Sequence, residues 1–173
     1  MLLTLIIIFV LYSNYKIQVV VDDKAVLLEI LDTAGQDEFT AMQSQWISFG
    51  NAFAILYDVT KRASFDRTKN FHHKILMVKD CDQKKQPPIV LIGNKIDLED
   101  QREVSTAEGE ELAAQLDAIF FETSARTNTN ITEAFHELTR RIRVYYGLGE
   151  QRNAEGTDQP KVKPKKGGLC ILL

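Results

Sequence analysis

Near-continuous apolar runs alternate with segments of helical spacing from the middle of the chain onward. The three runs are AFAILYDV (52–59), PIVLIGNK (88–95) and AIFFETS (118–124). Unbroken apolar stretches of this length are expected of strands that are covered on both faces, as in a parallel sheet. The alternation therefore predicts βαβ units and a mostly parallel, doubly wound α/β sheet.

Start signals and apolar stripes mark the helices of this pattern. Ser105 and Glu108 form a capping box, with Val104 placed as the hydrophobic staple. Asn130 and Glu133 are expected to do the same for the last helix, whose apolar stripe is Ile131, Ala134, Phe135, Leu138, Ile142 and Tyr145. The earlier helices are expected to turn inward Leu112, Ala113 and Leu116 and, near Ser64–Lys79, Phe65, Phe71, Ile75 and Val78.

The N-terminal part departs from this alternation. The stretch YKIQVVVDDKAVLLEILD (15–32) has the pattern of a hairpin, with Asp22-Asp23 at the turn. Before it, MLLTLIIIFVLY (1–12) is apolar but too short for a transmembrane helix, which needs about 20 residues. It also lacks the basic n-region and the cleavage site of a signal peptide. Three interpretations stay open: a buried strand, a membrane or targeting role, and a segment that is not native to the fold.

Composition and length add bounds to the pattern. The chain has 173 residues, 45% of them apolar and 26% charged, which fits one globular domain with a sizeable core. From Gly147 onward, Gly, Pro, Lys and polar residues replace the apolar pattern and indicate a flexible tail. We therefore expect an apolar segment over 1–12, a domain over 13–146 and a tail over 147–173.

Charge and cysteine usage exclude two broad classes. The net charge of −3 argues against a general nucleic-acid binder. The two cysteines, Cys81 and Cys170, lie far apart and form no disulfide framework, which indicates an intracellular, reducing compartment.

Candidate chemistry lies where the predicted strands end. In an open parallel sheet, ligands bind beyond the carboxyl ends of the strands. The residues at those ends fall in three segments, Asp32–Gln36, Asn94–Asp97 and Thr123–Arg126. Because these loops share one edge of the sheet, they can converge on one ligand.

The segment Asn94-Lys95-Ile96-Asp97 suits a purine base. The Asp97 carboxylate can accept two parallel hydrogen bonds from guanine N1–H and its exocyclic amine, a pair that adenine lacks. Asn94 can bridge loops or reach the base edge, and the Lys95 stem can lie over the purine face. The alternative is a helix-start turn that Asp97 merely caps.

The third loop favours the base-binding interpretation. Ala125 is small, so its backbone N–H can approach a base carbonyl oxygen such as guanine O6. The Ser124 hydroxyl can hold a neighbouring carboxylate in place. This loop follows a strand and precedes a capped helix, as the site requires.

Four motifs in this order resemble the Ras-type small GTPases, and the Ras branch in particular. They are D-T-A-G-Q (32–36), N-K-I-D-L (94–98), E-T-S-A-R (122–126) and C-I-L-L (170–173), and the resemblance runs from about Tyr15 to Tyr146. It implies a P-loop-NTPase-like three-layer G domain that binds and hydrolyses GTP as a membrane signalling switch. It also implies Mg²⁺ with GTP or GDP as cofactor, and exchange factors, GTPase-activating proteins and effectors as partners.

The resemblance assigns roles residue by residue. Asp32 is expected to hold Mg²⁺ through water, the Gly35 N–H to contact the γ-phosphate, and Gln36 to orient the attacking water. The mobile switch is expected to begin at 37–39. The full nucleotide-binding set is Asp32, Thr33, Ala34, Gly35, Asn94, Lys95, Asp97, Ser124, Ala125 and Arg126.

The sequence lacks the family's phosphate-binding loop, G-x-x-x-x-G-K-[ST]. Its first glycine is Gly35 and its first lysine is Lys16. The family's Mg²⁺-ligating threonine would fall at Val10, which has no side-chain oxygen. The expected domain therefore has its first strand, loop and first helix missing or replaced.

Two functional interpretations remain. In the first, the native protein is a GTP-hydrolysing switch of which this sequence is an incomplete reading. In the second, the chain is a catalytically dead, membrane-anchored interaction module. The absent first strand would be the central one, between the hairpin and 52–59. We expect Leu2–Val10 to extend the hairpin strand or pack as a stray apolar segment, and the domain to be poorly stable and prone to edge pairing.

The end of the tail carries a lipidation signal. Cys170-Ile171-Leu172-Leu173 fits C-a-a-X, and a terminal Leu favours geranylgeranyl over farnesyl. One lipid gives only marginal binding, so a second signal is needed. Four lysines can supply it by attraction to an anionic membrane surface, each worth about 1 kcal/mol: Lys161, Lys163, Lys165 and Lys166. We expect residence on the cytoplasmic face of the plasma membrane.

Overall fold

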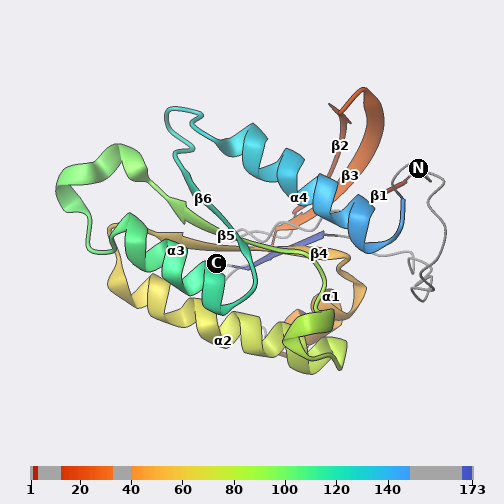
Figure 1. Cartoon of the computed structure of the whole chain (residues 1–173), viewed down its shortest axis with the longest axis horizontal. Helices are drawn as coiled ribbons and strands as arrows, with labels where there is room; N and C mark the ends of the chain where they lie inside the picture. Colours follow the sequence, from red (N-terminus) through yellow and green to blue (C-terminus); the bar gives the residue numbers. More distant parts are fainter. Residues whose placement is uncertain (1, 4–12, 33–39, 149–168, 173) are drawn as a thin grey trace, which may run out of the picture.

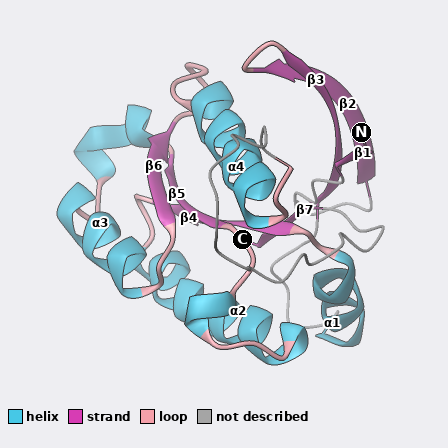
Figure 2. Ribbon diagram, turned by 45° about the vertical axis from the view of Figure 1, so that its right-hand side comes forward, coloured by secondary structure: helices cyan, strands magenta, loops and turns pink. Residues whose placement is uncertain are grey.

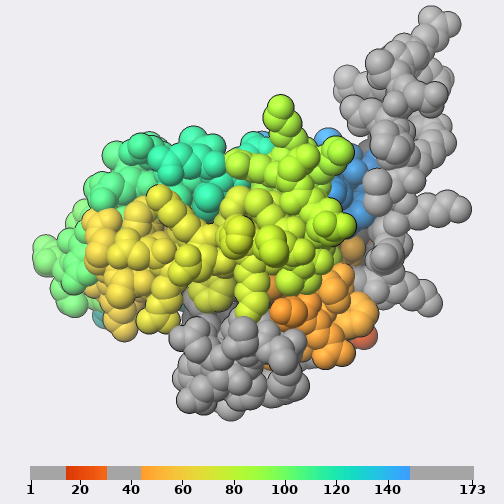
Figure 3. Space-filling view, turned by 90° about the horizontal axis from the view of Figure 1, so that it is seen from below, coloured from red at the N-terminus to blue at the C-terminus, as the bar shows by residue number. Residues whose placement is uncertain are grey.

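The structure is a computed structural model that describes residues 2–3, 13–32, 40–148 and 169–172, with side chains for 15–30 and 44–148. It is a three-layer α/β fold, which confirms the expected fold class (Figure 1). One face of the sheet carries α1 (Thr40–Phe49), α2 (Arg62–Lys79) and α3 (Thr106–Gln115), and the other carries α4 (Ile131–Tyr145) (Figure 2). Figure 3 views the molecule from the side of α1, in orange, and α2, in yellow.

The three apolar runs form the parallel strands that the pattern predicts. They are β4 (Ala52–Asp58), β5 (Ile89–Asn94) and β6 (Ile119–Thr123). β5 lies between β4 and β6, and Asp58, Asn94 and Thr123 are register partners at the carboxyl edge. The candidate loops after β5 and β6 therefore begin at the same level of the sheet.

The N-terminal hairpin is also confirmed. It consists of β2 (Ser13–Val21) and β3 (Lys24–Asp32), paired antiparallel. Asp22 and Asp23 form its turn with φ angles of 50° and 58°, the left-handed conformation that Asp tolerates better than most residues. α4 holds the tip, because Arg140 Nη2 donates to Asp22 Oδ1 (2.9 Å) and Arg143 Nη2 donates to the Val21 carbonyl (3.0 Å).

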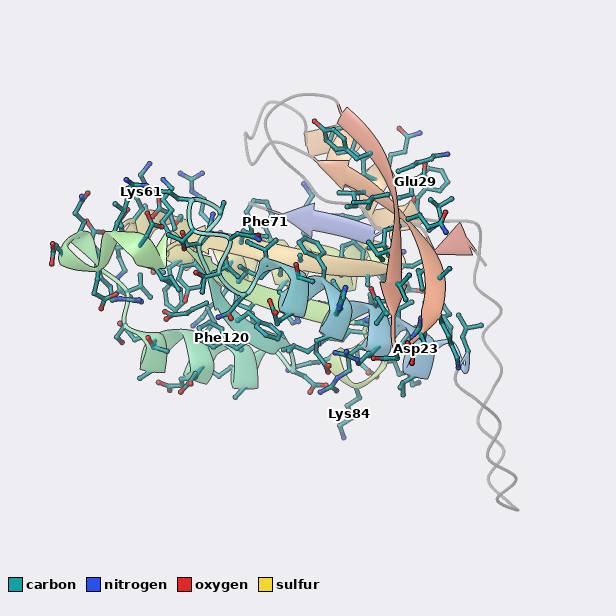
Figure 4. The ribbon with its side chains drawn as sticks, turned by 90° about the horizontal axis from the view of Figure 1, so that it is seen from above. Asp23, Glu29, Lys61, Phe71, Lys84 and Phe120 are labelled. Carbon is teal, nitrogen blue, oxygen red and sulfur yellow. The ribbon has the colours of Figure 1, made fainter. Side chains whose placement is uncertain are left out.

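The slot between the hairpin and β4 holds the end of the chain. Strand β7 (Leu169–Leu172) runs parallel to both β3 and β4, and it is the pale blue arrow between them in Figure 4. Strand β1 (Leu2–Leu3) pairs in parallel with Leu27 and Leu28 of β3. The order along the sheet is β1-β3-β7-β4-β5-β6, with β2 on the other edge of β3.

This arrangement corrects the expectation about the tail and partly tests the expectation about the apolar N-terminal segment. The tail was expected to be flexible throughout, but Leu169–Leu172 complete the sheet as a central strand. Of the apolar N-terminal segment, only Leu2–Leu3 are described, and they run along β3 rather than lengthening either hairpin strand. The remaining residues of that segment, Met1 and 4–12, lie outside the described residues.

The helix starts are partly as predicted. The Ser105–Glu108 capping box is present, and Val104 beside it is fully buried. The capping box expected at Asn130 is wrong: Asn130 has a φ of 56°, and its Nδ2 donates instead to the Glu122 carbonyl at 2.8 Å. Tyr145, at the end of the predicted stripe of α4, is 40% exposed.

Three short helices were not predicted. They are α1 and two 3₁₀ helices, η2 (Gln83–Lys85) and η3 (Ile96–Gln101). α1 has the sequence TAMQSQWISF, whose apolar residues are not gathered on one face, and among its described side chains only Ile47 is buried. A weak apolar stripe gives little signal for a helix.

The core packs most closely around Tyr57 of β4. Its ring meets Phe65 of α2 edge to face, with the centroids 5.0 Å apart. A Cβ at Gly109 of α3 would collide with the Tyr57 hydroxyl and the Phe120 ring, so this position requires glycine. Among the described residues the buried Tyr57 hydroxyl has no hydrogen-bond partner, and burial raises its pKa.

No helix in the described ranges is long and apolar enough to cross a membrane.

Candidate functional site

A tight turn after β5 presents the first group of candidate residues. Asn94 ends the strand, Lys95 adopts the left-handed conformation with φ 72°, and η3 begins at Ile96. The Leu98 N–H donates back to the Lys95 carbonyl at 3.0 Å and closes the turn. Asp97 therefore lies in the first turn of η3, directly above the carboxyl edge of the sheet.

Asn94 ties this turn to the loop after β6. Its Oδ1 accepts from the Thr123 hydroxyl at 3.2 Å and from the Ala125 N–H at 3.3 Å. The second distance lies just beyond the usual range of about 2.7–3.2 Å, so this bond is weak and the Ala125 N–H can also donate to another acceptor. One amide side chain thus fixes the separation of the two loops.

Ser124 positions the Asp97 carboxylate. The fully buried Ser124 hydroxyl donates to Asp97 Oδ1 at 2.6 Å and accepts from the Thr127 N–H at 3.1 Å. The Asp97 side chain is 13% exposed, and Arg126 Nη1 lies 3.7 Å from its Oδ2. The N-cap of η3 is Lys95, so Asp97 is oriented by another loop and is not the cap of its own turn.

Lys95 reaches the end of β4. Its Nζ lies 2.7 Å from Asp58 Oδ2, while Asp58 Oδ1 accepts from the N–H and the hydroxyl of Thr60 at 2.9 and 2.6 Å. Burial raises the pKa of Asp58, but the hydrogen bonds from Lys95 and Thr60 outweigh it and hold the pKa below its ordinary value. Asp58 is therefore ionised and fixes the lysine stem along the edge of the sheet.

Asp58 and Thr60 were missed from the sequence. The rule that ligands lie beyond the carboxyl ends of parallel strands selects them as well, since Asp58 is the last residue of β4. The signal was present in the run AFAILYDV, whose only charged residue is this aspartate.

A second layer of ion pairs holds the loop after β6. Arg102 Nη1 lies 2.6 Å from Glu122 Oε1, and Arg102 Nε lies 2.8 Å from Glu99 Oε2. The hydrogen bond to Glu122 raises the pKa of Arg102. Because Asn130 binds the Glu122 carbonyl, the strand end, η3 and the start of α4 form one connected unit.

The remaining predicted nucleotide-binding residues are those that the resemblance assigns to the phosphates and the metal. Asp32 is the last residue of β3, and its backbone pairs with Ile171 of β7, which in turn pairs with Ala54. Thr33, Ala34, Gly35 and Gln36 lie outside the described residues, as do positions 37–39 and Val10. In the described part of the chain no three His, Cys, Asp or Glu side chains gather as a metal site.

Cys170, the candidate lipidation residue, lies within β7. Its backbone pairs with Leu31 on one side and with Phe53 on the other. The structure thus brings together Asn94, Lys95, Asp97, Ser124, Ala125 and Arg126, and it places Asp32 and Cys170 by backbone alone.

Comparisons with known proteins agree with the motifs. The sequence model of the Ras family matches residues 8–144. The chain is 43% identical over 162 residues to Ras-like protein RAS2 of Hydra vulgaris, covering 93% of this chain and 78% of that protein. It is 43% identical over 165 residues to Ras-like protein rasS of Dictyostelium discoideum, covering 94% and 82%. Ras-like protein of Laccaria bicolor is 46% identical over 170 residues, covering 93% and 80%.

Proposed function

Because the chain belongs to the Ras family of small GTPases, we propose that it recognises guanine nucleotides through the loops after β5 and β6. The observation that carries this proposal is the Asp97 carboxylate, which the buried Ser124 hydroxyl orients at 2.6 Å. A carboxylate held in this way can accept from guanine N1–H and the exocyclic amine without reorganisation. The Ala125 N–H and Asn94 lie beside it as further contacts to the base.

The hydrogen-bond acceptors of the proposed site fit guanine and reject adenine. Asp97 supplies only acceptors when ionised, and guanine offers two adjacent donors on one edge, whereas adenine offers an unprotonated N1 there. An adenine would give the carboxylate no hydrogen bond from the base in a mostly buried site, which costs about 1–3 kcal/mol or more. The Lys95 stem would cover one face of the base, and the ion pair of its Nζ with Asp58 supports this role.

The decisive experiment changes Asp97→Asn and measures competition of GDP, XDP and ADP against a fluorescent guanine nucleotide. Xanthine has a carbonyl oxygen where guanine has its amine, so the variant is expected to move its preference toward XDP by at least about tenfold. Asp100→Asn is the matched control, because Asp100 is an exposed acid in the same 3₁₀ helix. Full guanine selectivity in the Asp97 variant would remove the assignment.

We further propose the family's roles on the phosphate side. Asp32 would hold Mg²⁺ of the GTP or GDP complex through water, within the segment Asp32, Thr33, Ala34 and Gly35, and Gln36 would orient the attacking water. When bound, the metal supplies neutralisation of charge on the phosphates. What supports these roles is the sequence D-T-A-G-Q, which begins at Asp32, the last residue of β3, at the edge where β4, β5 and β6 also end.

A second candidate function has its own support in the sequence. The printed sequence contains no G-x-x-x-x-G-K-[ST] loop, which supplies the N–H groups and the lysine that bind phosphates in the family. Without such a loop the chain would act as a catalytically dead, membrane-anchored interaction module. Sequencing the 5′ end of the transcript separates the two, because an in-frame loop motif upstream supports the hydrolysing switch.

Anchoring at the cytoplasmic face of the plasma membrane is part of the same proposal. Its supports are the C-I-L-L ending, which favours geranylgeranylation of Cys170, and the lysines at 161, 163, 165 and 166. Exchange factors, GTPase-activating proteins and effectors are the partners that family membership suggests.

Fractionation of cells that express the full chain tests the anchor. Cys170→Ser is expected to release the protein from membranes, while Cys81→Ser, the other cysteine, leaves it bound. Replacing the four lysines with Gln removes about 4 kcal/mol of attraction, roughly a thousandfold in binding to anionic vesicles. Leu173→Ser is expected to shift the lipid toward farnesyl. A chain that stays on membranes after Cys170→Ser contradicts the proposal.

A further inference from the structure

The C-terminal strand occupies a position that the sheet cannot leave empty. β7 pairs on both edges, with Ile30–Asp32 of β3 and with Ala52–Ile55 of β4. Among the described strands it alone joins the hairpin to the β4–β6 half of the sheet. Figures 2 and 4 both show it between the two halves.

The edge of β4 explains why an occupant is needed. Ala52, Phe53, Ala54 and Ile55 are all fully buried. Buried backbone N–H and C=O groups require hydrogen-bond partners, and each unpaired group costs about 1–3 kcal/mol. The Phe53 N–H donates to the Pro88 carbonyl on the β5 side at 2.9 Å. Because successive amides of a strand point to opposite edges, the Ala54 N–H points to the edge that β7 covers.

The tail is suited to fill this position. The sequence Leu-Cys-Ile-Leu is apolar and contains no proline, as a central strand requires. Residues 149–168 join it to the end of the domain, and 20 residues can span up to about 70 Å. A tethered strand of this kind acts at an effective concentration on the order of millimolar, so it competes well against strands of other molecules.

We propose that insertion of β7 into the sheet and lipidation of Cys170 exclude each other. The inference rests on the lipidation proposed above. In that reaction the Cys170 sulfur bonds to the terminal carbon of an isoprenoid diphosphate, diphosphate leaves, and the thiol proton passes to solvent. The transferase must hold Cys170–Leu173 in its own site. The residues Cys170–Leu172 cannot also pair with Leu31 and Phe53, so the strand must leave the sheet first.

The exclusion makes the structure of the sheet depend on whether Cys170 carries the lipid. The unmodified chain has a completed sheet, and the modified chain has open edges on β3 and β4. Lipidation is slowed by the fraction of molecules in which the strand is inserted, so a tenfold preference for insertion lowers the rate about tenfold. The same residues therefore decide both where the protein resides and whether its central strand is present.

Residue-resolved amide hydrogen exchange on the full chain tests the exclusion. One sample is unmodified, one is lipidated in vitro by a geranylgeranyltransferase with geranylgeranyl diphosphate, and one ends at Gly168. We expect the Ala54 amide to exchange at least about tenfold faster in the lipidated and shortened chains than in the unmodified one. The Phe53 amide, which bonds to β5, is the internal control and is expected to change far less.

Each outcome has a distinct meaning. A slowly exchanging Ala54 amide in the lipidated chain overturns the exclusion. Equal Ala54 exchange in the unmodified and shortened chains overturns the insertion itself. A chain that the transferase never modifies overturns the proposed anchor and the exclusion with it, while the shortened chain still shows separately whether β7 completes the sheet.

Discussion

The proposed base side and the proposed phosphate side of the same sheet edge are built in opposite ways. On the base side, the loops after β5 and β6 bind each other directly: Ser124 donates to Asp97 at 2.6 Å, and Asn94 accepts from Thr123 and Ala125 at 3.2 and 3.3 Å. On the phosphate side, β3 reaches β4 only through a strand from the far end of the chain. The proposed base contacts lie on consecutive βαβ units, so their geometry does not depend on what precedes them. The proposed phosphate side depends on the strand between the halves.

The two halves also differ in how completely they are covered. In β4 and β5 almost every side chain is buried between helices on both faces. In the hairpin, Ile17 is 48% exposed and Tyr15 57% exposed, although Ile17 pairs with Leu28, which is only 2% exposed. α4 covers the tip of the hairpin and leaves its other end open among the described residues. The hairpin is therefore the weaker half.

The largest expected effect is on the nucleotide's phosphates. The chain as printed should bind GTP, GDP and guanosine with affinities within about tenfold of one another, each weaker than about 1 µM, because the base contacts remain and no phosphate loop adds to them. Isothermal titration with the three ligands measures this directly. Hydrolysis is expected at background, so Gln36→Leu should change nothing. Nanomolar GTP binding would show that the phosphate side is complete after all.

Matched truncations in the two halves give the next largest effect. Ile55→Ala in β4 removes a fully buried side chain and should lower the free energy of unfolding by about 2–5 kcal/mol, or prevent folding. Ile17→Ala in β2 removes a half-exposed side chain and should cost less than about 1 kcal/mol. Urea unfolding of both variants, with the slope compared to that of the parent, checks the difference. Equal losses would mean that the hairpin is as well packed as β4.

Local patterns predicted the base side well, because its structure follows from short-range signals. The strands at 52–58, 89–94 and 119–123 are long apolar runs, and the Ser105 capping box depends on residues three apart. The roles given to Asn94, Asp97 and Ser124 stay predictions, but the structure joins Asp97 to Ser124, and Asn94 to the same loop through Thr123 and Ala125. The capping box predicted at Asn130 was wrong because a tertiary hydrogen bond to the Glu122 carbonyl replaces the local cap.

The position of the tail could not be predicted from local patterns. Pairing of Leu169–Leu172 with β3 and β4 joins residues more than 100 positions apart, and periodicity carries no information about such contacts. The sequence C-I-L-L fits both a lipidation signal and a buried strand, because both require apolar residues. Only the position between β3 and β4, which needs a partner strand, favours the buried strand over a free tail. The Asp58–Lys95 pair was missed for a related reason, since it joins two different strands.

The smallest expected effect concerns pH and sharpens the base side alone. The folded protein holds the pKa of Asp58 below its unfolded value of about 3.9, so Asp58 stabilises the fold fully above that pH. The contribution is lost as the pH falls through the lowered folded pKa.

Asp58→Asn keeps an oxygen for the Thr60 donors and loses the charge opposite Lys95. The gap in stability between the parent and this variant should therefore be constant above about pH 4 and shrink as the pH falls below that value. Asp66→Asn, an exposed change on α2, is expected to keep a constant gap in the same thermal unfolding series. A constant gap for Asp58→Asn as well would show that the Lys95 pair adds nothing to the fold, and that the lysine stem is not fixed over the base.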